Sequence, residues 1–249
     1  MSEQQRPDAI VAENLGVRYG DVRALREVTV RIRRGSITGL VGVNGSGKSS
    51  MLAAVLERVQ HEGSVRILGG TPAEARRAGL VASVPQAEVV DWDFPVTVRD
   101  VVMTGRYGRM GLLRIPRPSD RAAVDEAMER LGLVRLADRQ IGQLSGGQRK
   151  RAFVARALAQ DAELLLLDEP FAAVDRTSEA AIVQVLRELR GLGRSVVIVH
   201  HDLSGVAELV DEVLLLQRGR LLHHGPPAET LTPERIARAF GAGGREEDQ

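Results

Sequence analysis

Short apolar segments alternate with amphipathic stretches along most of this chain. The apolar or alternating segments have strand length: Val28–Arg33, Ile37–Val41, Val65–Leu68, Leu80–Val84, Leu164–Leu167, Ser195–Val199, Val213–Gln217 and Leu221–His224. Helical spacing predicts Lys48–Val59, Asp120–Leu131 capped by Ser119, Gln148–Ala159, Ser178–Arg190 ended by Gly191, and Pro233–Phe240. Strands separated by helices predict an α/β fold with a mostly parallel sheet.

The middle third of the sequence has a different pattern. Thr97 is followed three residues later by Asp100, which predicts a variant of the capping box, and Gly105–Pro118 has the composition of a loop. We expect a helical insertion at about 87–155 within a single domain spanning 1–240, because no linker or internal repeat divides the chain. The polar residues 241–249 are expected to be a disordered tail.

Composition narrows the class of protein. The 249 residues include no cysteine, which excludes disulfides, thiolate metal sites and cysteine nucleophiles. Basic and acidic residues nearly cancel, 34 against 33, so the totals do not indicate a nucleic-acid partner. No apolar run approaches the ~20 residues of a membrane-spanning helix, and no secretory signal is evident, so a cytoplasmic location is expected.

Residues 42–49, Gly-Val-Asn-Gly-Ser-Gly-Lys-Ser, match the pattern GxxxxGK[ST] between a predicted strand and a predicted helix. Glycines allow successive amides to point at phosphate oxygens, and the helix N-terminus favours negative charge. Lys48, one of two lysines in the chain, could reach the β- and γ-phosphates, and Ser49 could supply an oxygen to Mg²⁺. The alternative is a glycine turn that binds no ligand.

Two acids follow the apolar strand 164–167. The C-terminal edge of a parallel sheet is where ligands bind in open α/β folds. There Asp168 is placed to hold Mg²⁺ and Glu169 to polarise an attacking water, although acids also end strands at ordinary surfaces.

Residues 144–148, Leu-Ser-Gly-Gly-Gln, form a second helix start with free amides, a second anion site by the same physics. This segment resembles the signature of the nucleotide-binding subunits of ATP-binding cassette (ABC) transporters, and the resemblance extends from about Ala9 to Phe240 with the motifs in order. It implies a P-loop ATPase fold with a mostly parallel core sheet, an antiparallel β subdomain and a helical insertion. The implied ligands are ATP and Mg²⁺.

The resemblance also implies roles for individual residues. Tyr19 is similar to the aromatic that stacks on adenine, or is a partly buried strand residue. Gln86 is similar to the glutamine that contacts Mg²⁺ or water, or is an exposed loop residue. Asp175 is similar to the aspartate that communicates between subunits, or caps the next helix. His201 matches the histidine at the γ-phosphate, whereas His200 has no such match. The implied nucleotide-binding set is Tyr19, Gly42, Asn44, Gly45, Ser46, Gly47, Lys48, Ser49, Ser50, Ser145, Gly146, Gly147, Gln148, Asp168 and Asp175; the catalytic set is Gln86, Glu169 and His201; the Mg²⁺ set is Ser49, Gln86 and Asp168.

In this family two chains pack head to tail, so that each ATP lies between the Lys48 loop of one chain and the Ser145 segment of the other. The resemblance therefore implies an ATP-dependent homodimer. It also implies a membrane permease that docks near Gln86 to Met110, an external substrate-binding protein, and a peripheral position on the inner face of the membrane. Aromatic and methionine residues gather in this stretch, at Trp92, Phe94, Met103, Tyr107 and Met110, and a local core is the alternative explanation.

The stretches 90–98, 105–108, 148–151 and 171–175 look like the branch that imports manganese, zinc and iron. We expect the transported ion to pass through the permease, and interpret His223–His224 as a surface pair. Alternatives are an importer of iron-siderophore or haem, or an ABC ATPase outside transport, such as one in iron–sulfur cluster assembly.

Overall fold

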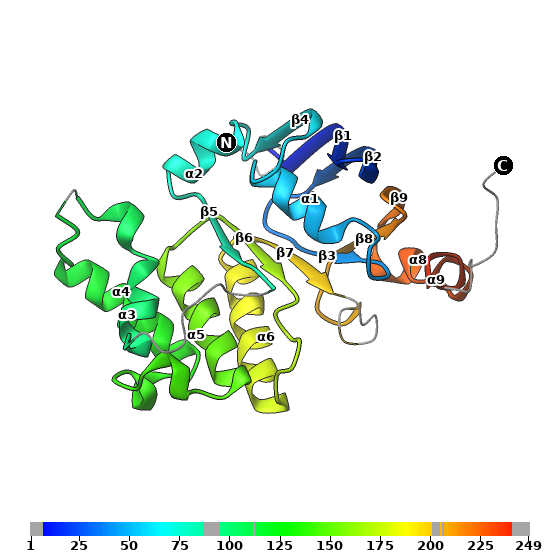
Figure 1. Cartoon of the computed structure of the whole chain (residues 1–249). Helices are drawn as coiled ribbons and strands as arrows, with labels where there is room; N and C mark the ends of the chain where they lie inside the picture. Colours follow the sequence, from blue (N-terminus) through cyan, green and yellow to red (C-terminus); the bar gives the residue numbers. More distant parts are fainter. Residues whose placement is uncertain (1–6, 87–94, 112, 201–204, 206, 241–249) are drawn as a thin grey trace. The chain divides into compact units, whose positions relative to one another are not determined.

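A computed structural model describes residues 7–86, 95–111, 113–200, 205 and 207–240. The chain divides into two compact units (Figure 1). Residues 1–73 and 197–249 are here called the phosphate-loop unit, and residues 74–196 the signature unit. Trp92, Phe94, His201 and the tail 241–249, all named in the sequence predictions, lie outside the described residues.

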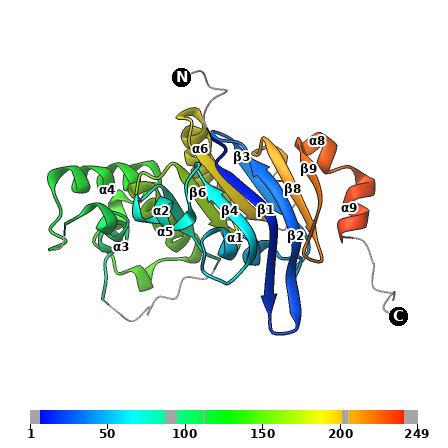
Figure 2. The same ribbon diagram turned by 90° about the horizontal axis from the view of Figure 1, so that it is seen from above.

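The phosphate-loop unit contains an antiparallel sheet in the order β2-β1-β4, formed by β1 (Ile10–Tyr19), β2 (Val22–Ile32) and β4 (Glu62–Ile67). Figure 2 shows these three strands side by side. The register pairs Ile10 with both Ile32 and Ile67, which brings three buried isoleucines together. Helix α1 (Lys48–Val55) packs against this sheet.

This unit also contains strands β3, β8 and β9 and residues 197–200 of β7 (Ser195–His200), which are neighbours in the order β7-β3-β8-β9. Strand β3 (Ile37–Val41) is buried along its whole length and runs parallel to β8 (Glu212–Gln217), which pairs antiparallel with β9 (Arg220–Gly225). Strands β8 and β9 form a hairpin across Arg218-Gly219. Short helices α8 (Pro227–Thr230) and α9 (Pro233–Phe240) follow β9.

The signature unit contains β5 (Val81–Val84) and β6 (Leu164–Asp168), which pair in parallel. The next strand in the sheet order after β6 is β7 (Ser195–His200), whose first two residues belong to this unit. Residues 74–77 of α2 (Pro72–Arg77) also belong here. Between β5 and β6 come α3 (Val98–Thr104), η2 (Tyr107–Arg109), α4 (Pro118–Arg130), η3 (Val134–Leu136), η4 (Ile141–Gln143) and α5 (Gly146–Ala159). Helices α3 and α4 pack on α5, and α6 (Arg176–Gly191) packs on its other side (Figure 1).

This architecture confirms the expected α/β class with parallel core strands, an antiparallel β subdomain and a helical insertion. The single-domain boundary at 1–240 stays a prediction. Among the described residues, no helix has the length and apolar character needed to cross a membrane.

Several local predictions need correction. Ser119 does not cap α4: the N-cap is Arg117, Pro118 takes the first helical position, and the Asp120 carboxylate accepts the Arg117 backbone N–H at 3.0 Å. Helix α1 ends at Val55, before Glu57 adopts a left-handed φ of 51°. Strand β1 was not predicted, because register shifts break its alternating pattern.

His223 and His224 are half-buried and face different partners, so they are not a surface pair. His223 Nδ1 lies 3.0 Å from Thr230 Oγ1, and His224 Nε2 lies 3.1 Å from the Glu212 carboxylate. Glu212 is 3% exposed and also accepts hydrogen bonds from Thr38 Oγ1 at 3.0 Å and the Arg33 backbone N–H at 3.3 Å. Burial raises the pKa of Glu212, but the bonds from His224, Arg33 and Thr38 outweigh it and lower the pKa to about 2.

This buried carboxylate predicts a specific acid dependence of stability. Because its folded pKa lies below the usual glutamate value of 4.5, ionised Glu212 stabilises the protein above pH 4.5, and this contribution is lost as the pH falls towards 2. We expect Glu212→Gln to lower the free energy of unfolding by about 3 kcal/mol at pH 7, with the difference from wild type shrinking as the pH falls from 5 to 3.

Urea unfolding at a series of pH values measures this difference. Glu13→Gln is the control, because Glu13 pairs with Arg31 on an exposed surface of the same unit. A Glu212→Gln penalty that stays constant with pH, or equals that of Glu13→Gln, would contradict the assignment.

Candidate functional site

The loop between β3 and α1 folds back on the first lysine of the helix. Lys48 is 5% exposed, and its Nζ donates hydrogen bonds to the carbonyl oxygens of Gly42 at 2.8 Å and Val43 at 2.9 Å. A buried ammonium group is thereby fixed at the start of α1, where backbone N–H groups have no helical acceptor. The predicted glycine loop is therefore organised around a positive charge.

Gly47 caps this helix with a left-handed φ of 105° and no side-chain cap. A Cβ at this position would lie 2.6 Å from the Ala24 carbonyl oxygen, so the backbone needs glycine here for both φ and space. Without a capping side chain, the first N–H groups of α1 are left for an anion to accept.

The fit to a phosphate group rests on a further observation. Ser46 is 1% exposed, and its Oγ has no hydrogen-bond partner among the described residues. A buried hydroxyl without a partner is costly, and a phosphate oxygen in the loop would supply one. Asn44, Gly45 and Ser49 are exposed, and Ser50 is half-buried.

The turn between β8 and β9 forms backbone hydrogen bonds that hold the loop before Lys48 in place. The sequence did not predict this contact. The Gly219 N–H donates to the Ser46 carbonyl oxygen at 3.0 Å, and the Arg26 N–H donates to the Gly219 carbonyl oxygen at 2.8 Å. The loop is thus tied to a segment about 170 residues away, a contact that no local pattern predicts.

In the signature unit, β6 ends at the first of the two predicted acids, Asp168, and the second, Glu169, follows directly. Asp168 is half-buried, and Glu169 is 8% exposed with a left-handed φ of 49°. Non-glycine residues in this conformation cost free energy and are concentrated at functional sites. Gln86 Nε2 donates to Glu169 Oε2 at 3.3 Å, so the structure brings together two of the three predicted catalytic residues.

The segment 144–148 forms a complete capping box at the start of α5. Gln148 N–H donates to Ser145 Oγ at 3.3 Å, and Ser145 N–H donates to Gln148 Oε1 at 3.0 Å. Ser145 and Gly146 are exposed, whereas Gly147 is buried. Ser145 and the N-terminus of α5 are therefore presented on the surface of this unit.

Asp175 is the N-cap of α6, so the capping interpretation of this residue is confirmed. Its Oδ1 accepts the Ser178 backbone N–H and its Oδ2 accepts the Ser178 hydroxyl, both at 2.9 Å. Hydrogen bonds from the Ser178 backbone and side chain hold the pKa of Asp175 below its usual value. Ser178 was missed as a candidate residue, although an aspartate followed three residues later by serine is a recognisable start of a helix.

Tyr19 ends β1 and is 48% exposed, which leaves its ring accessible for stacking.

Within the expected docking stretch the structure describes residues 95–110, and the solvent exposure of its side chains differs from one residue to another. Met110 is 9% exposed, whereas Tyr107 is 39% exposed with the Arg114 guanidinium 5.1 Å from its ring centroid. Met110 fits a local core and Tyr107 an accessible surface.

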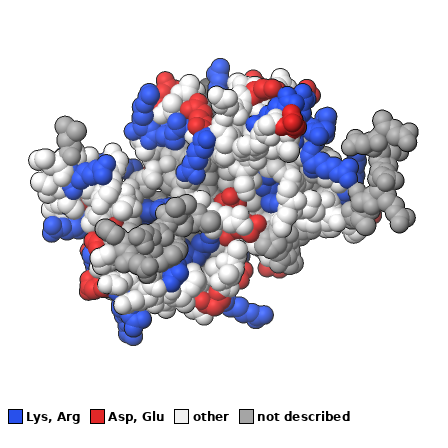
Figure 3. All heavy atoms as spheres, in the orientation of Figure 1, with Lys and Arg blue, Asp and Glu red and all other residues white. Residues whose placement is uncertain are grey.

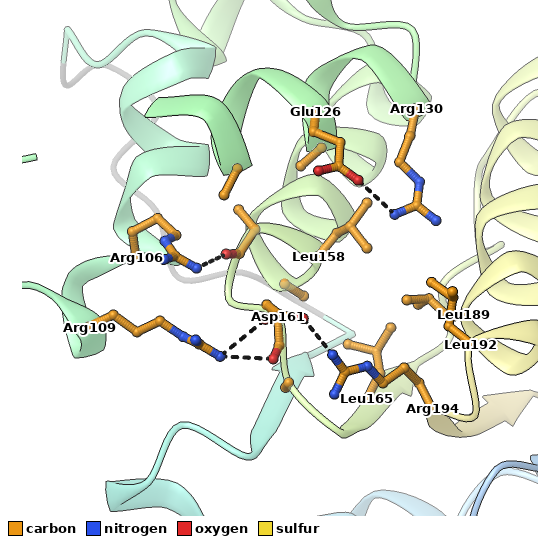
Figure 4. A pocket seen from close by; sticks show the side chains of 15 residues that line it. Arg106, Arg109, Glu126, Arg130, Leu158, Asp161, Leu165, Leu189, Leu192 and Arg194 are labelled. Atoms are coloured by element: carbon orange, nitrogen blue, oxygen red, sulfur yellow. Dashed lines mark hydrogen bonds and ion pairs between the residues drawn. The ribbon is translucent and has the colours of Figure 1, made fainter. Parts of the chain in front are cut away.

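A hollow of about 350 Å³ lies in the signature unit, away from these motifs (Figure 4). Arg106 donates to the Ala159 carbonyl oxygen at 2.9 Å and pairs with buried Asp120 at 3.0 Å. Arg109 donates to the carbonyl oxygens of Gln160 and Asp161. These arginines donate hydrogen bonds to carbonyl oxygens at the end of α5. Their position around the hollow therefore has a structural explanation.

On the face drawn in Figure 3, basic and acidic side chains are interspersed. Among the described residues, no group of three or more histidines or acids is arranged to hold a metal ion.

Comparisons with known proteins agree with one another. A family model described as "ABC transporter" matches residues 25–172. The manganese transport system ATP-binding protein MntA of Synechocystis sp. is 47% identical over 234 residues, covering 93% of this chain and 90% of that protein. The zinc transport system ATP-binding protein TroB of Treponema pallidum is 44% identical, covering 94% and 87%. Among solved structures, cbiO1 from Clostridium perfringens, part of the ABC transporter complex cbiONQ, has a TM-score of 0.77 at 27% identity, covering 93% of this chain and 94% of that one.

Proposed function

Because the chain belongs to the ABC transporter family, we propose that it is the ATP-hydrolysing subunit of an importer for a divalent metal cation: manganese, zinc or iron. The observation that supports nucleotide binding is the loop around Lys48. It brings together a buried ammonium group, a helix start without a capping side chain, and the Ser46 hydroxyl, which has no hydrogen-bond partner within the described part of the chain. Together these features favour a bound phosphate group.

ATP is the substrate in this proposal. The phosphates bind the backbone of Gly42, Asn44, Gly45, Ser46 and Gly47 and the side chains of Lys48, Ser49 and Ser50, and Tyr19 stacks on adenine. Ser49, Gln86 and Asp168 offer a hydroxyl, an amide and a carboxylate oxygen, a donor set that suits Mg²⁺. When bound, Mg²⁺ neutralises charge on the transferring phosphate.

Glu169 acts as the general base. It accepts a proton from water as that water attacks the γ-phosphorus, ADP leaves, and inorganic phosphate forms. The contact with Gln86 orients the carboxylate, and the left-handed backbone fixes where its side chain begins. His201 contacts the γ-phosphate in this proposal and stabilises the charge that develops on it.

Each pocket is completed by a second copy of the chain. Ser145, Gly146, Gly147 and Gln148 of one copy bind the ATP held by the Lys48 loop of the other, and Asp175 communicates between the copies. The exposed N-terminus of α5 supports this arrangement, because it offers N–H groups to a phosphate that approaches from outside the unit. ATP thereby holds the dimer together, and hydrolysis releases it.

The transported ion is proposed from the relatives, whose names specify manganese, zinc and chelated iron transport systems. In this proposal the chain lies on the inner face of the cell membrane, bound to a permease through residues near Gln86 to Met110. An external substrate-binding protein delivers the ion. Tyr107, accessible within that stretch, supports the docking surface.

Element-by-element metal analysis of a deletion strain tests the proposed cargo. We expect cells lacking this chain to contain less manganese, zinc or iron, and to regain it with the wild-type gene but not with Glu169→Gln. Loss of haem or siderophore uptake alone would identify another importer. Unchanged metal contents and uptake, with a defect in iron–sulfur enzymes, would place the ATPase outside transport.

A further inference from the structure

The start of α5 and the start of α6 meet within the signature unit at Gly147. A Cβ at Gly147 would lie 2.6 Å from Asp175 Oδ2 and 2.9 Å from Ser178 Oγ, closer than real Cβ atoms approach other groups. Gly147 is the second residue of α5, whereas Asp175 and Ser178 form the cap of α6. The two helix N-termini are therefore in direct contact at Gly147, where a larger residue would displace the side chains of Asp175 and Ser178.

Ser178 holds the carboxylate at this contact in one orientation. It is fully buried, at 0% exposed, and it binds both oxygens of Asp175, one with its backbone N–H and one with its hydroxyl. The hydroxyl is the donor that fixes Oδ2, which is the oxygen nearest to Gly147. Without this hydroxyl, Oδ2 would be free to turn towards the amides of α5.

The orientation of the Asp175 carboxylate is important because the carboxylate is negatively charged. The N-terminus of α5 attracts negative charge, and an ionised carboxylate that turned towards it would occupy the same N–H groups that a phosphate needs. The bonds from Ser178 keep Asp175 on the N-terminus of α6, where the carboxylate satisfies a different helix, and they hold its pKa low so that it stays ionised. The amides of α5 are then left for a phosphate.

We propose that Ser178 is a positioning residue for ATP-dependent dimerisation: its hydroxyl keeps the Asp175 carboxylate bonded at the N-terminus of α6, so that the carboxylate does not occupy the N–H groups of α5 that bind the second chain's ATP. This inference rests on the proposed function, because it requires that the Ser145 segment binds ATP held by another copy. Ser178 itself touches no nucleotide.

The test compares variants in a Glu169→Gln background, in which ATP is expected to hold the dimer. Size-exclusion chromatography at increasing ATP gives the concentration for half-maximal dimer. We expect Ser178→Ala to raise it at least about fivefold, the effect of losing a helix-cap hydrogen bond. ATP binding to the dilute monomer, measured by equilibrium dialysis, stays unchanged, because the Lys48 loop lies in the other unit.

Two further variants separate positioning from stability. Thr97→Ala removes the N-cap hydroxyl of α3 in the same unit, so its melting temperature falls by a similar amount while the dimerisation midpoint stays in place. Ser178→Thr keeps a hydroxyl and restores the midpoint. If Ser178→Ala does not fold, Ser178→Cys takes its place, because its thiol occupies the same position but is a much weaker donor to Asp175 Oδ2 than the hydroxyl.

The outcomes are distinct. An unchanged midpoint in Ser178→Ala, or equal shifts in Ser178→Ala and Thr97→Ala, would overturn the positioning role while leaving the proposed function intact. Failure of the Glu169→Gln parent to dimerise with ATP would instead overturn the proposed function.

Discussion

Glu169→Gln is expected to bind ATP normally, accumulate as an ATP-bound dimer and turn over about 10²–10⁴ times more slowly than wild type. Glutamine has the size of glutamate but cannot take the proton from the attacking water. The site is otherwise preserved, because the position is 8% exposed and its backbone already adopts a left-handed φ of 49°. Steady-state phosphate release and size-exclusion chromatography with ATP measure the two effects.

The matched control is Glu126→Gln, an exposed acid on α4 of the same unit that pairs with Arg130. We expect it to hydrolyse ATP at the wild-type rate and to show no trapped dimer. If Glu169→Gln kept full turnover, Glu169 would not be the base. A slow variant that remained monomeric with ATP would instead contradict the ATP-dependent dimer of the proposed function.

Lys48→Ala is expected to weaken ATP binding by at least about tenfold to a hundredfold, since one charged hydrogen bond contributes about 1.5–3 kcal/mol. The substitution removes a buried ammonium group and leaves the Gly42 and Val43 carbonyl oxygens without their donor. The loop then loses both its charge and its internal support. Equilibrium dialysis with ATP measures the loss.

The chain offers a natural control in its other lysine. Lys150 lies on α5 in the other unit, and its Nζ is 3.4 Å from the Gln86 carbonyl oxygen. We expect Lys150→Ala to leave ATP binding by the monomer unchanged. Equal losses in the two variants would mean that general positive charge, and not the loop, holds the nucleotide.

Features that depend on neighbouring residues were predictable from the sequence. The glycine loop before Lys48, the helix start after Ser145 and the Thr97 capping box each depend on contacts within a few residues, and the structure has all three. Asp175 shows the limit: the resemblance implies a role between subunits, a helix cap was the alternative, and the structure establishes the cap.

Contacts between distant segments could not be predicted. The Glu212–His224 pair joins two strands of the same hairpin, but its Thr38 and Arg33 partners come from more than 170 residues earlier. The Gly147–Asp175 contact likewise depends on how α5 and α6 pack. The sequence pattern does not identify β1, because its bulges interrupt the alternation typical of a strand. It also predicts the wrong cap, Ser119, because Pro118 is already the first helical residue.

The claim on which the account depends is that each ATP pocket combines the Lys48 loop of one copy with the Ser145 segment of another. Mixing Lys48→Ala with Ser145→Arg tests it, because a mixed dimer has one pocket with both parts intact. The account predicts that each variant alone is inactive and that an equal mixture recovers up to about one quarter of wild-type turnover, since half of randomly formed dimers are mixed and each has one working pocket. An inactive mixture, or a Ser145→Arg chain with full activity on its own, would contradict it.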